Sequence, residues 1–163
     1  MLALALLAGC GDEDEQSTAP PSTQPSETQT QTTAAADIKD TSLKPVIEKP
    51  TGRVPRKLRR EDIVKGKGAA AKPGDELTVQ YVGVTFSTGE QFDASWDSGK
   101  PFSFQLGAGQ VIPGWDRGLR GMKQGGRRRL VIPPGQAYGA QGSPPAIGPN
   151  ETLVFVVDLV GLR

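Results

Sequence analysis

Hydrophobic and polar residues alternate in several short stretches of the second half of the chain. In ELTVQYVGVTF, residues 76–86, Leu77, Val79 and Tyr81 alternate with Thr78 and Gln80. This period of two, with its β-branched and aromatic residues, predicts a strand with one buried face. The Pro-Gly turn of AKPGDE precedes it, and EDIVKGKG, residues 61–68, is predicted as an earlier strand that ends in glycines.

Two further stretches show the same period. PFSFQLG, residues 101–107, places Phe102, Phe104 and Leu106 on one face of a predicted strand. RRRLVIP, residues 127–133, places Leu130 and Ile132 toward the core. Two prolines then end this strand, because proline has no N–H to donate within a sheet.

The last predicted strand, ETLVFVVDLVGL at residues 151–162, is apolar on both faces. Leu153, Phe155, Val157 and Leu159 lie on one face, and the other carries Val154, Val156, Val160 and Asp158. Because this second face is also largely apolar, we expect part of it to be covered.

One stretch has helical spacing instead. In QVIPGWDRGLRGM, residues 110–122, Trp115, Leu119 and Met122 recur at helical intervals, which predicts a helix from Pro113 to about Met122. The chain is therefore predicted to be α+β, with about five antiparallel strands curved around one short helix that covers the apolar face. Trp115 packs this helix onto the sheet, at the edge of the core, where its ring can form the floor of a cavity.

The first 52 residues have a different composition. All nine aromatic residues, two Trp, two Tyr and five Phe, lie beyond position 80. Residues 11–52, rich in Ser, Thr, Gln, Pro and acidic side chains, are predicted to be a disordered linker, because they offer too little apolar surface to offset the entropy of ordering. Within this linker, only LKPVIEKP, residues 43–50, is expected to dock transiently. Residues 53–163 are predicted to form the folded domain.

The N-terminus contains a short apolar run, LALALLAGC, that ends in small residues and Cys10. A membrane span needs about 20 apolar residues, whereas this length suits the core of a secretory signal. The ending Leu7-Ala8-Gly9-Cys10 resembles the bacterial lipobox, in which cleavage before the cysteine leaves it to carry a lipid. Residues 1–10 are therefore predicted to be a lipoprotein-type signal segment, with the domain exported and lipid-anchored to the bacterial cell membrane, facing outside the cytoplasm. No basic residue precedes the run, so the alternative is a hydrophobic start with a chance cysteine.

Composition excludes several kinds of chemistry. Histidine is absent and Cys10 is the single cysteine, so the usual transition-metal clusters and the Ser-His or Cys-His pairs are unavailable, and neither a metal nor a cofactor is expected. Residues 53–163 are moderately basic, with 16 basic and 10 acidic side chains. Nucleic-acid binding through Arg127-Arg128-Arg129 and the stretch from Arg53 to Lys67 is not expected, because strand alternation sends the three arginines to both faces and no stacking aromatics accompany them.

Five blocks in order resemble the FKBP-type peptidyl-prolyl isomerases: VQYVG, GEQFDASWDSGKPFSFQLG, QVIPGWDRGLRGMKQGGRRRLVIPP, AYGAQG and NETLVFVVDLVGL. The resemblance covers roughly residues 56–163 and implies an antiparallel sheet curved around a short helix, with a ligand pocket lined by aromatics. It implies catalytic roles for Tyr81, Phe92, Asp93, Ile112, Tyr138 and Phe155. It implies substrate binding by Phe102, Phe104, Val111, Trp115 and Ile147, with Trp115 as the floor under a proline ring.

The implied activity is rotation about X-Pro bonds. Their cis-trans isomerisation is slow because rotation breaks amide resonance. In the twisted state the amide is less dipolar, so an apolar pocket favours it without a nucleophile, metal or cofactor. The resemblance places Tyr81, Phe92 and Phe155 around the rotating carbonyl. It assigns the Ile112 N–H to a peptide carbonyl and makes the Tyr138 hydroxyl a donor. The expected partners are X-Pro-containing polypeptides and macrolide inhibitors, and the protein is expected to be a monomer.

The sequence departs from the family pattern beside Asp93. Many relatives carry an arginine five residues later, where this chain has Ser98, so Asp93 is expected to lack its usual ionic partner. Ser143 and the small Ala146 stand where bulkier residues are common, which is expected to alter substrate preference or weaken macrolide binding. The alternative function is a membrane-tethered chaperone or Pro-segment binding module that uses the same pocket with little turnover. Without the five blocks, the strand phenylalanines would be predicted to be core residues.

Overall fold

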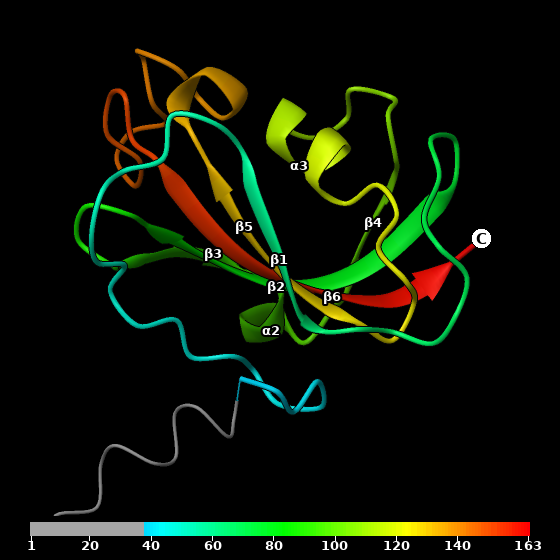
Figure 1. The fold of residues 1–163 in the computed structure, drawn as a ribbon. Helices are drawn as coiled ribbons and strands as arrows, with labels where there is room; N and C mark the ends of the chain where they lie inside the picture. Colours follow the sequence, from blue (N-terminus) through cyan, green and yellow to red (C-terminus); the bar gives the residue numbers. More distant parts are fainter. Residues whose placement is uncertain (1–37) are drawn as a thin grey trace, which may run out of the picture.

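The computed structural model describes residues 38–163, which fold into a strongly curved antiparallel sheet with a short helix inside the curve (Figure 1). The six strands are β1 (Arg59–Val64), β2 (Glu76–Thr85), β3 (Gln91–Ala94), β4 (Phe102–Gln105), β5 (Arg127–Ile132) and β6 (Leu153–Leu162). The helices are α2 (Ser95–Ser98), α3 (Pro113–Gly118) and the 3-10 helix η1 (Pro134–Gln136).

The two longest strands form the centre of the sheet. The strand order is β1-β5-β6-β2-β3, and β4 also pairs with β2. β2 and β6 pair antiparallel along their whole length, from Leu77 opposite Leu162 to Thr85 opposite Leu153. On its other edge β2 pairs with β4 through its first half and with β3 through its second half. This shared edge brings β3 and β4 to the same side of β2.

The predicted α+β fold is confirmed, with two differences in detail. The sheet includes a strand that the sequence pattern did not predict, β3, because in QFDA only Phe92 is a large apolar residue. Helix α3 ends at Gly118 instead of near Met122. The chain continues from there as a turn in which the Met122 N–H donates to the Leu119 carbonyl at 3.0 Å, so Met122 still reaches the core without a further helical turn.

Helix α3 approaches the sheet closely because glycines face it. A Cβ on Gly114 would lie 2.3 Å from Ile132 Cγ2, and a Cβ on Gly118 would lie 2.8 Å from Leu130 Cδ2. Since real side chains do not approach so closely, both positions require glycine at this helix-to-sheet distance. The helix thereby buries Trp115 against the inner face of the sheet, where it joins the main core.

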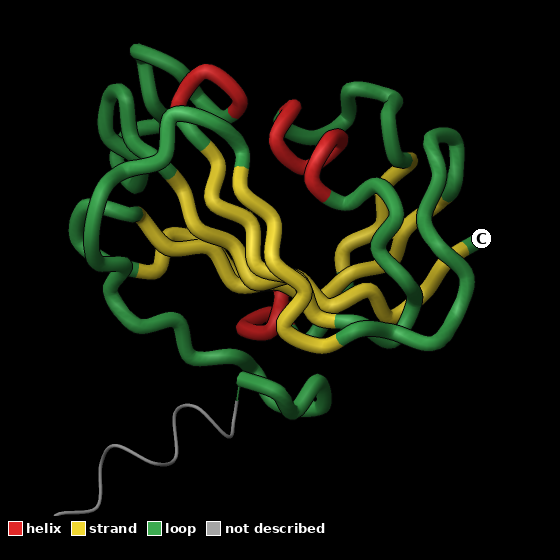
Figure 2. The backbone as a smooth tube through the Cα atoms, in the orientation of Figure 1, coloured by secondary structure: helices red, strands yellow, loops and turns green. Residues whose placement is uncertain are grey.

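The outer face of the sheet is covered by the chain that precedes β1. A smaller core of Val82, Val84, Ala94 and Val154 lies on this face, and Ile47 packs against it. We call residues 38–52 the strap. It is loop throughout (Figure 2), with Pro45 and Pro50 buried. The prediction of a disordered linker is therefore wrong for residues 38–52, and residues 43–50, which were expected to dock only transiently, lie against the sheet. The rest of the predicted linker, and Cys10, lie outside the described residues.

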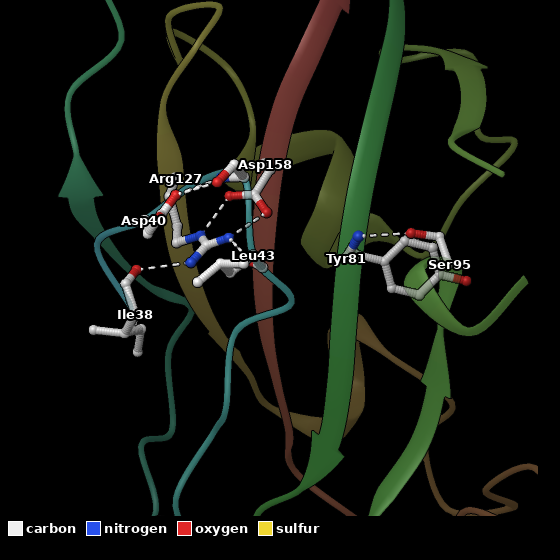
Figure 3. Close-up of polar contacts among 8 residues, drawn as sticks. Ile38, Asp40, Leu43, Tyr81, Ser95, Arg127 and Asp158 are labelled. Carbon is white, nitrogen blue, oxygen red and sulfur yellow. Dashed lines mark hydrogen bonds and ion pairs between the residues drawn. The ribbon is translucent and has the colours of Figure 1, made fainter. Parts of the chain in front are cut away.

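One buried arginine fixes the strap to the central strands (Figure 3). The guanidinium of Arg127 donates to both carboxylate oxygens of Asp158, at 2.5 Å and 2.8 Å, and both side chains are almost fully buried. It also donates to the main-chain carbonyls of Ile38, at 2.9 Å, and Leu43, at 2.8 Å. Burial raises the pKa of Asp158, and the hydrogen bonds and charge of Arg127 oppose that rise. The largely apolar outer face predicted for β6 is thus covered, with its one carboxylate paired.

Strand alternation separates the three consecutive arginines, as predicted. Arg127 faces the strap, whereas Arg128 faces the other side of the sheet and donates to the Gly118 carbonyl at 2.8 Å. Arg128 also forms an ion pair with Asp62 at 2.6 Å. These contacts hold the end of α3 to β1 and β5.

The helices described among residues 38–163 are all too short or too polar to span a bilayer.

Candidate active site

A cavity of about 450 Å³ opens beside α3. Residues from four strands, from α3, from the loop before it and from the segment after η1 line this cavity. They are Tyr81, Phe92, Asp93, Phe102, Gln110, Val111, Ile112, Trp115, Tyr138 and Phe155. Most of the wall is aromatic, and the cavity joins parts of the chain that are far apart in sequence.

Trp115 lies at the base of the cavity and is fixed by its ring contacts. It is only 4% exposed. Its ring centroid lies 5.1 Å from that of Tyr81 and 5.3 Å from that of Phe155, with interplanar angles of 84° and 85°. Phe92 meets Phe155 in the same edge-to-face manner, at 5.4 Å. Such contacts favour one orientation of each ring, so the walls are preorganised before a ligand binds.

A glycine on β2 makes room for two of these rings. A Cβ on Gly83 would lie 2.7 Å from Phe92 Cζ and 2.8 Å from Phe155 Cε1. Any side chain at this position would therefore displace these rings. The sequence pattern shows Gly83 only as an interruption of a strand, and it gives no sign that two aromatic rings occupy the space.

The polar group at the rim is Asp93, which accepts a hydrogen bond from the Tyr81 hydroxyl at 2.5 Å. Within residues 38–163 Asp93 forms no ion pair. The Ser98 hydroxyl instead donates to the Ser95 carbonyl at 2.8 Å. Ser95 in turn fixes the backbone beneath the ring, because its Oγ accepts from the Tyr81 N–H at 2.8 Å (Figure 3).

Tyr81 is therefore expected to ionise late. Burial and, next, the hydrogen bond to Asp93 raise the pKa of its hydroxyl. Because the unfolded chain releases this proton near its ordinary pKa of 10.0 while the folded chain retains it, this contribution to stability is present below that pH and falls as pH rises above it. Tyrosinate absorbance and urea unfolding, measured across this pH range, check both statements. In an Asp93→Asn variant Tyr81 should ionise at a lower pH, and an unchanged titration would contradict the role of the carboxylate.

The loop before α3 is held by a carboxylate of that helix. Asp116 accepts from the N–H groups of Gly107, at 2.8 Å, and Gly109, at 3.2 Å. This turn leads into Gln110, Val111 and Ile112 at the cavity. Within residues 38–163 no hydrogen bond from the Ile112 N–H is found, so this donor is available to a ligand carbonyl.

The structure brings together nine of the eleven residues that the sequence assigned to the pocket. Phe104 and Ile147 do not line the cavity, and each is 4% exposed in the main core. Phe104 lies behind the wall, stacked on Phe102 with ring centroids 5.6 Å apart. Gln110 lines the cavity and was not predicted, because a lone polar residue beside Val111 gives no signal. Among residues 38–163 no group of His, Cys, Asp and Glu could hold a metal ion.

The curved sheet and its aromatic cavity define a domain with a preformed apolar binding site. A family model described as FKBP-type peptidyl-prolyl cis-trans isomerase matches residues 67–160. The chain therefore belongs to the FKBP-type peptidyl-prolyl cis-trans isomerases.

Individual relatives agree with this assignment. An FK506-binding protein of Streptomyces anulatus is 55% identical over 120 residues, which cover 73% of this chain and 97% of that protein. A probable FK506-binding protein of Corynebacterium glutamicum is 51% identical over 117 residues, which cover 72% of this chain and 97% of that protein. Among solved structures, AtFKBP13 matches with a TM-score of 0.61 and 37% identity, over 65% of this chain and 93% of that one. The chain is a peptidyl-prolyl cis-trans isomerase.

Proposed function

We propose that the aromatic cavity at Trp115 is where this enzyme rotates X-Pro bonds. The observation that carries the proposal is the arrangement of three aromatic side chains, Tyr81, Phe92 and Phe155, above a buried indole floor. A proline ring has the size and polarity to lie on that floor. The preceding carbonyl then projects among the rings, where its rotation takes place.

The geometry supports catalysis by environment instead of by covalent chemistry. A planar amide is a strong dipole that water stabilises, and twisting it removes conjugation and part of that dipole. Transfer into an apolar wall therefore costs the planar form more than the twisted form. Only this difference accelerates rotation, since equal binding of both forms would lower KM without raising kcat.

Two donors orient the substrate. The unpaired N–H of Ile112 donates to a peptide carbonyl beyond the proline, which fixes the direction of the chain across the cavity. Tyr138, which lines the cavity and is 42% exposed, offers its hydroxyl to the peptide as the second donor. The relatives are named for FK506 binding, and we extend to this cavity the capacity to accept macrolides of that class.

A Phe92→Ala variant tests the cavity as the site. Its conversion of a cis X-Pro reporter peptide should be about tenfold to a hundredfold slower in kcat/KM, because the variant loses an apolar wall worth about 1.5–3 kcal/mol when buried. Phe86→Ala is the matched control, since Phe86 is an aromatic residue that packs on the outer face of the sheet. FK506 should inhibit the parent protein competitively.

The two alternatives give different results in this assay. A folded parent protein that binds Pro-containing peptides without accelerating their isomerisation would replace the proposed mechanism with that of a Pro-segment binding module. If Phe92→Ala and Phe86→Ala lost activity equally, the cause would be lower stability of both variants and not the loss of a cavity wall.

We further propose that the domain acts on exported or surface proteins from a lipid anchor at Cys10. The support is the run LALALLAGC and the polar segment that separates it from the domain. Expressed in a bacterium, the chain should incorporate labelled fatty acid, and Cys10→Ser should abolish that labelling and release the protein from the membrane fraction. Labelling that persists in Cys10→Ser would overturn the anchor.

A further inference from the structure

A second cavity, of about 210 Å³, lies where the end of the strap meets the edge of the sheet. Its walls come from the end of the strap and the residues just after it, from β1 and β5, and from the residue that follows β2. The lining residues are Pro50, Thr51, Arg53, Pro55, Arg59, Arg60, Glu61, Phe86, Arg129 and Val131. None of them belongs to the aromatic active site.

The strand register shows which face of the sheet this cavity occupies. Arg59 pairs with Val131, and Glu61 pairs with Arg129, so these four side chains share one face. Val131 packs against the smaller core on the outer face of the sheet. The cavity therefore opens on the side of the sheet that faces the strap, away from α3.

The lining is strongly positive. Four arginines, 53, 59, 60 and 129, and one carboxylate, Glu61, are among the lining residues, although Arg60 pairs with Leu130 and so belongs to the opposite face of the sheet. Within the part of the chain that the structure describes, none of these four arginines forms an ion pair. Glu61 and Arg129 are cross-strand neighbours, yet they too lie beyond ion-pair distance of each other. The positive charge is thus available to a ligand.

Arg129 adds a specific requirement. Its Nε is buried, and no hydrogen-bond partner for it is found among residues 38–163. A buried N–H of a charged group without an acceptor is costly, so such groups are almost always paired. Arg128, the preceding residue, is paired in the ordinary way, since its guanidinium donates to Asp62 and to two main-chain carbonyls.

We propose that this cavity is a binding site for a phosphate group. Guanidinium groups bind phosphate oxygens through paired, charge-assisted hydrogen bonds, and several arginines around one small cavity suit a multiply charged anion better than a single carboxylate. The apolar part of the lining, Phe86, Val131, Pro50 and Pro55, suits the organic portion of a phosphate ester. The phosphate belongs either to a small soluble compound or to the headgroup of an anionic lipid.

Occupation of this site would also join the strap to the sheet. Thr51 and Arg53 lie at or just beyond the end of the strap, whereas Arg59 and Arg129 belong to β1 and β5. One anion held by arginines from both sides acts as a bridge between them. Binding is therefore expected to slow cleavage of the strap at its lysines by trypsin as well as to raise the unfolding temperature.

The test uses the full 163-residue chain with Cys10→Ser, so that no lipid is attached. Inorganic phosphate is titrated by calorimetry at constant ionic strength. The cavity variant is Arg59→Gln with Arg129→Gln. The control is Arg56→Gln with Arg117→Gln, two exposed arginines outside the cavity, which removes the same charge. We expect saturable binding by the parent and the control, and binding at least about tenfold weaker in the cavity variant, as for hydrogen bonds between charged groups.

A second measurement covers the case in which the cavity variant fails to fold. In the parent chain, phosphate should protect Arg59 and Arg129 from an arginine-selective reagent, while Arg56 and Arg117 stay reactive. Absence of saturable phosphate binding, equal weakening in both variants, or no selective protection would overturn the site.

Vesicles distinguish the two sources of phosphate. Binding to phosphatidylglycerol vesicles, but not to phosphatidylcholine vesicles, that is lost in the cavity variant and kept in the control would assign the site to a lipid headgroup. Phosphate binding with no such vesicle binding would assign it to a soluble compound. If an oligonucleotide bound through these arginines while inorganic phosphate did not bind, that result would contradict a small-anion site.

Discussion

Asp158→Ala is expected to lower the free energy of unfolding by about 3–5 kcal/mol, because it removes the carboxylate that accepts two hydrogen bonds from the buried guanidinium of Arg127. Arg127 is fully buried, and Asp158 is 1% exposed, so water cannot replace the carboxylate. Denaturant unfolding of the variant measures the loss. Removing the other partner, in Arg127→Met, should lower the free energy of unfolding by a similar amount, since it leaves the Asp158 carboxylate buried without Arg127.

The double variant Arg127→Met, Asp158→Leu separates the ion pair from its second role. Replacing a buried pair by apolar side chains is often close to neutral, so most of the stability of the sheet should return. The strap should not recover, because the carbonyls of Ile38 and Leu43 lose their donor. Trypsin should then cleave at Lys39, Lys44 or Lys49 faster than in the parent. A double variant whose strap is as protected as in the parent would show that Arg127 does not hold it.

Trp115→Ala is expected to cost about 3–5 kcal/mol of stability and to remove nearly all isomerase activity. The indole contacts the rings of Tyr81, Phe102, Phe104 and Phe155, so its loss opens a cavity in the core and removes the floor of the active site. Unfolding measurements and the X-Pro peptide assay follow the two effects. The assay is run at a temperature where both proteins are folded.

Trp115→Phe provides the comparison. A phenyl ring keeps an apolar floor, so this variant should retain much more activity than Trp115→Ala even though it also loses packing. Two variants with equal activity per folded molecule would show that the floor does not take part in catalysis.

Most of the strands were predictable because their two faces differ. Leu77, Val79 and Tyr81 alternate with polar residues on β2, and the same contrast marks β4 and β5, whereas β6 was predictable from its unbroken run of β-branched and other apolar residues. β3 was not predicted because a short edge strand needs little apolar surface of its own and so shows no alternating pattern in the sequence. The end of α3 was misplaced because Met122 continues the helical spacing, while Gly121, with a φ of 72°, has already turned the chain.

The strap shows where composition misleads. Residues 38–52 contain few apolar side chains, yet they are ordered against the sheet by contacts whose other half lies far along the chain. The carbonyls of Ile38 and Leu43 meet a guanidinium 89 and 84 residues later. A main-chain acceptor has no signature in the sequence, so the attachment to Arg127 could not be predicted, although transient docking of residues 43–50 was expected.

The candidate site was predictable to the extent that the family blocks specify it. Alternation alone assigned the aromatics of β4 to the core, and for Phe104 that prediction was the better one. The blocks located Tyr81, Phe92 and Trp115 at one cavity, which spacing within a strand could not do. Neither source indicated Gly83, whose role depends on two rings from other strands.

The attachment of the strap also decides how the domain responds to mechanical load. A pull on the chain at Ile38 reaches the folded part first at Arg127, and through Asp158 it is passed to β6 in the middle of the sheet. Without this attachment the same force would act on the exposed edge strand β1, which could then separate from β5 one hydrogen bond at a time. The strap thus carries tension from the N-terminal part of the chain to the centre of the sheet, so that this force does not act on edge strand β1 or on the active site.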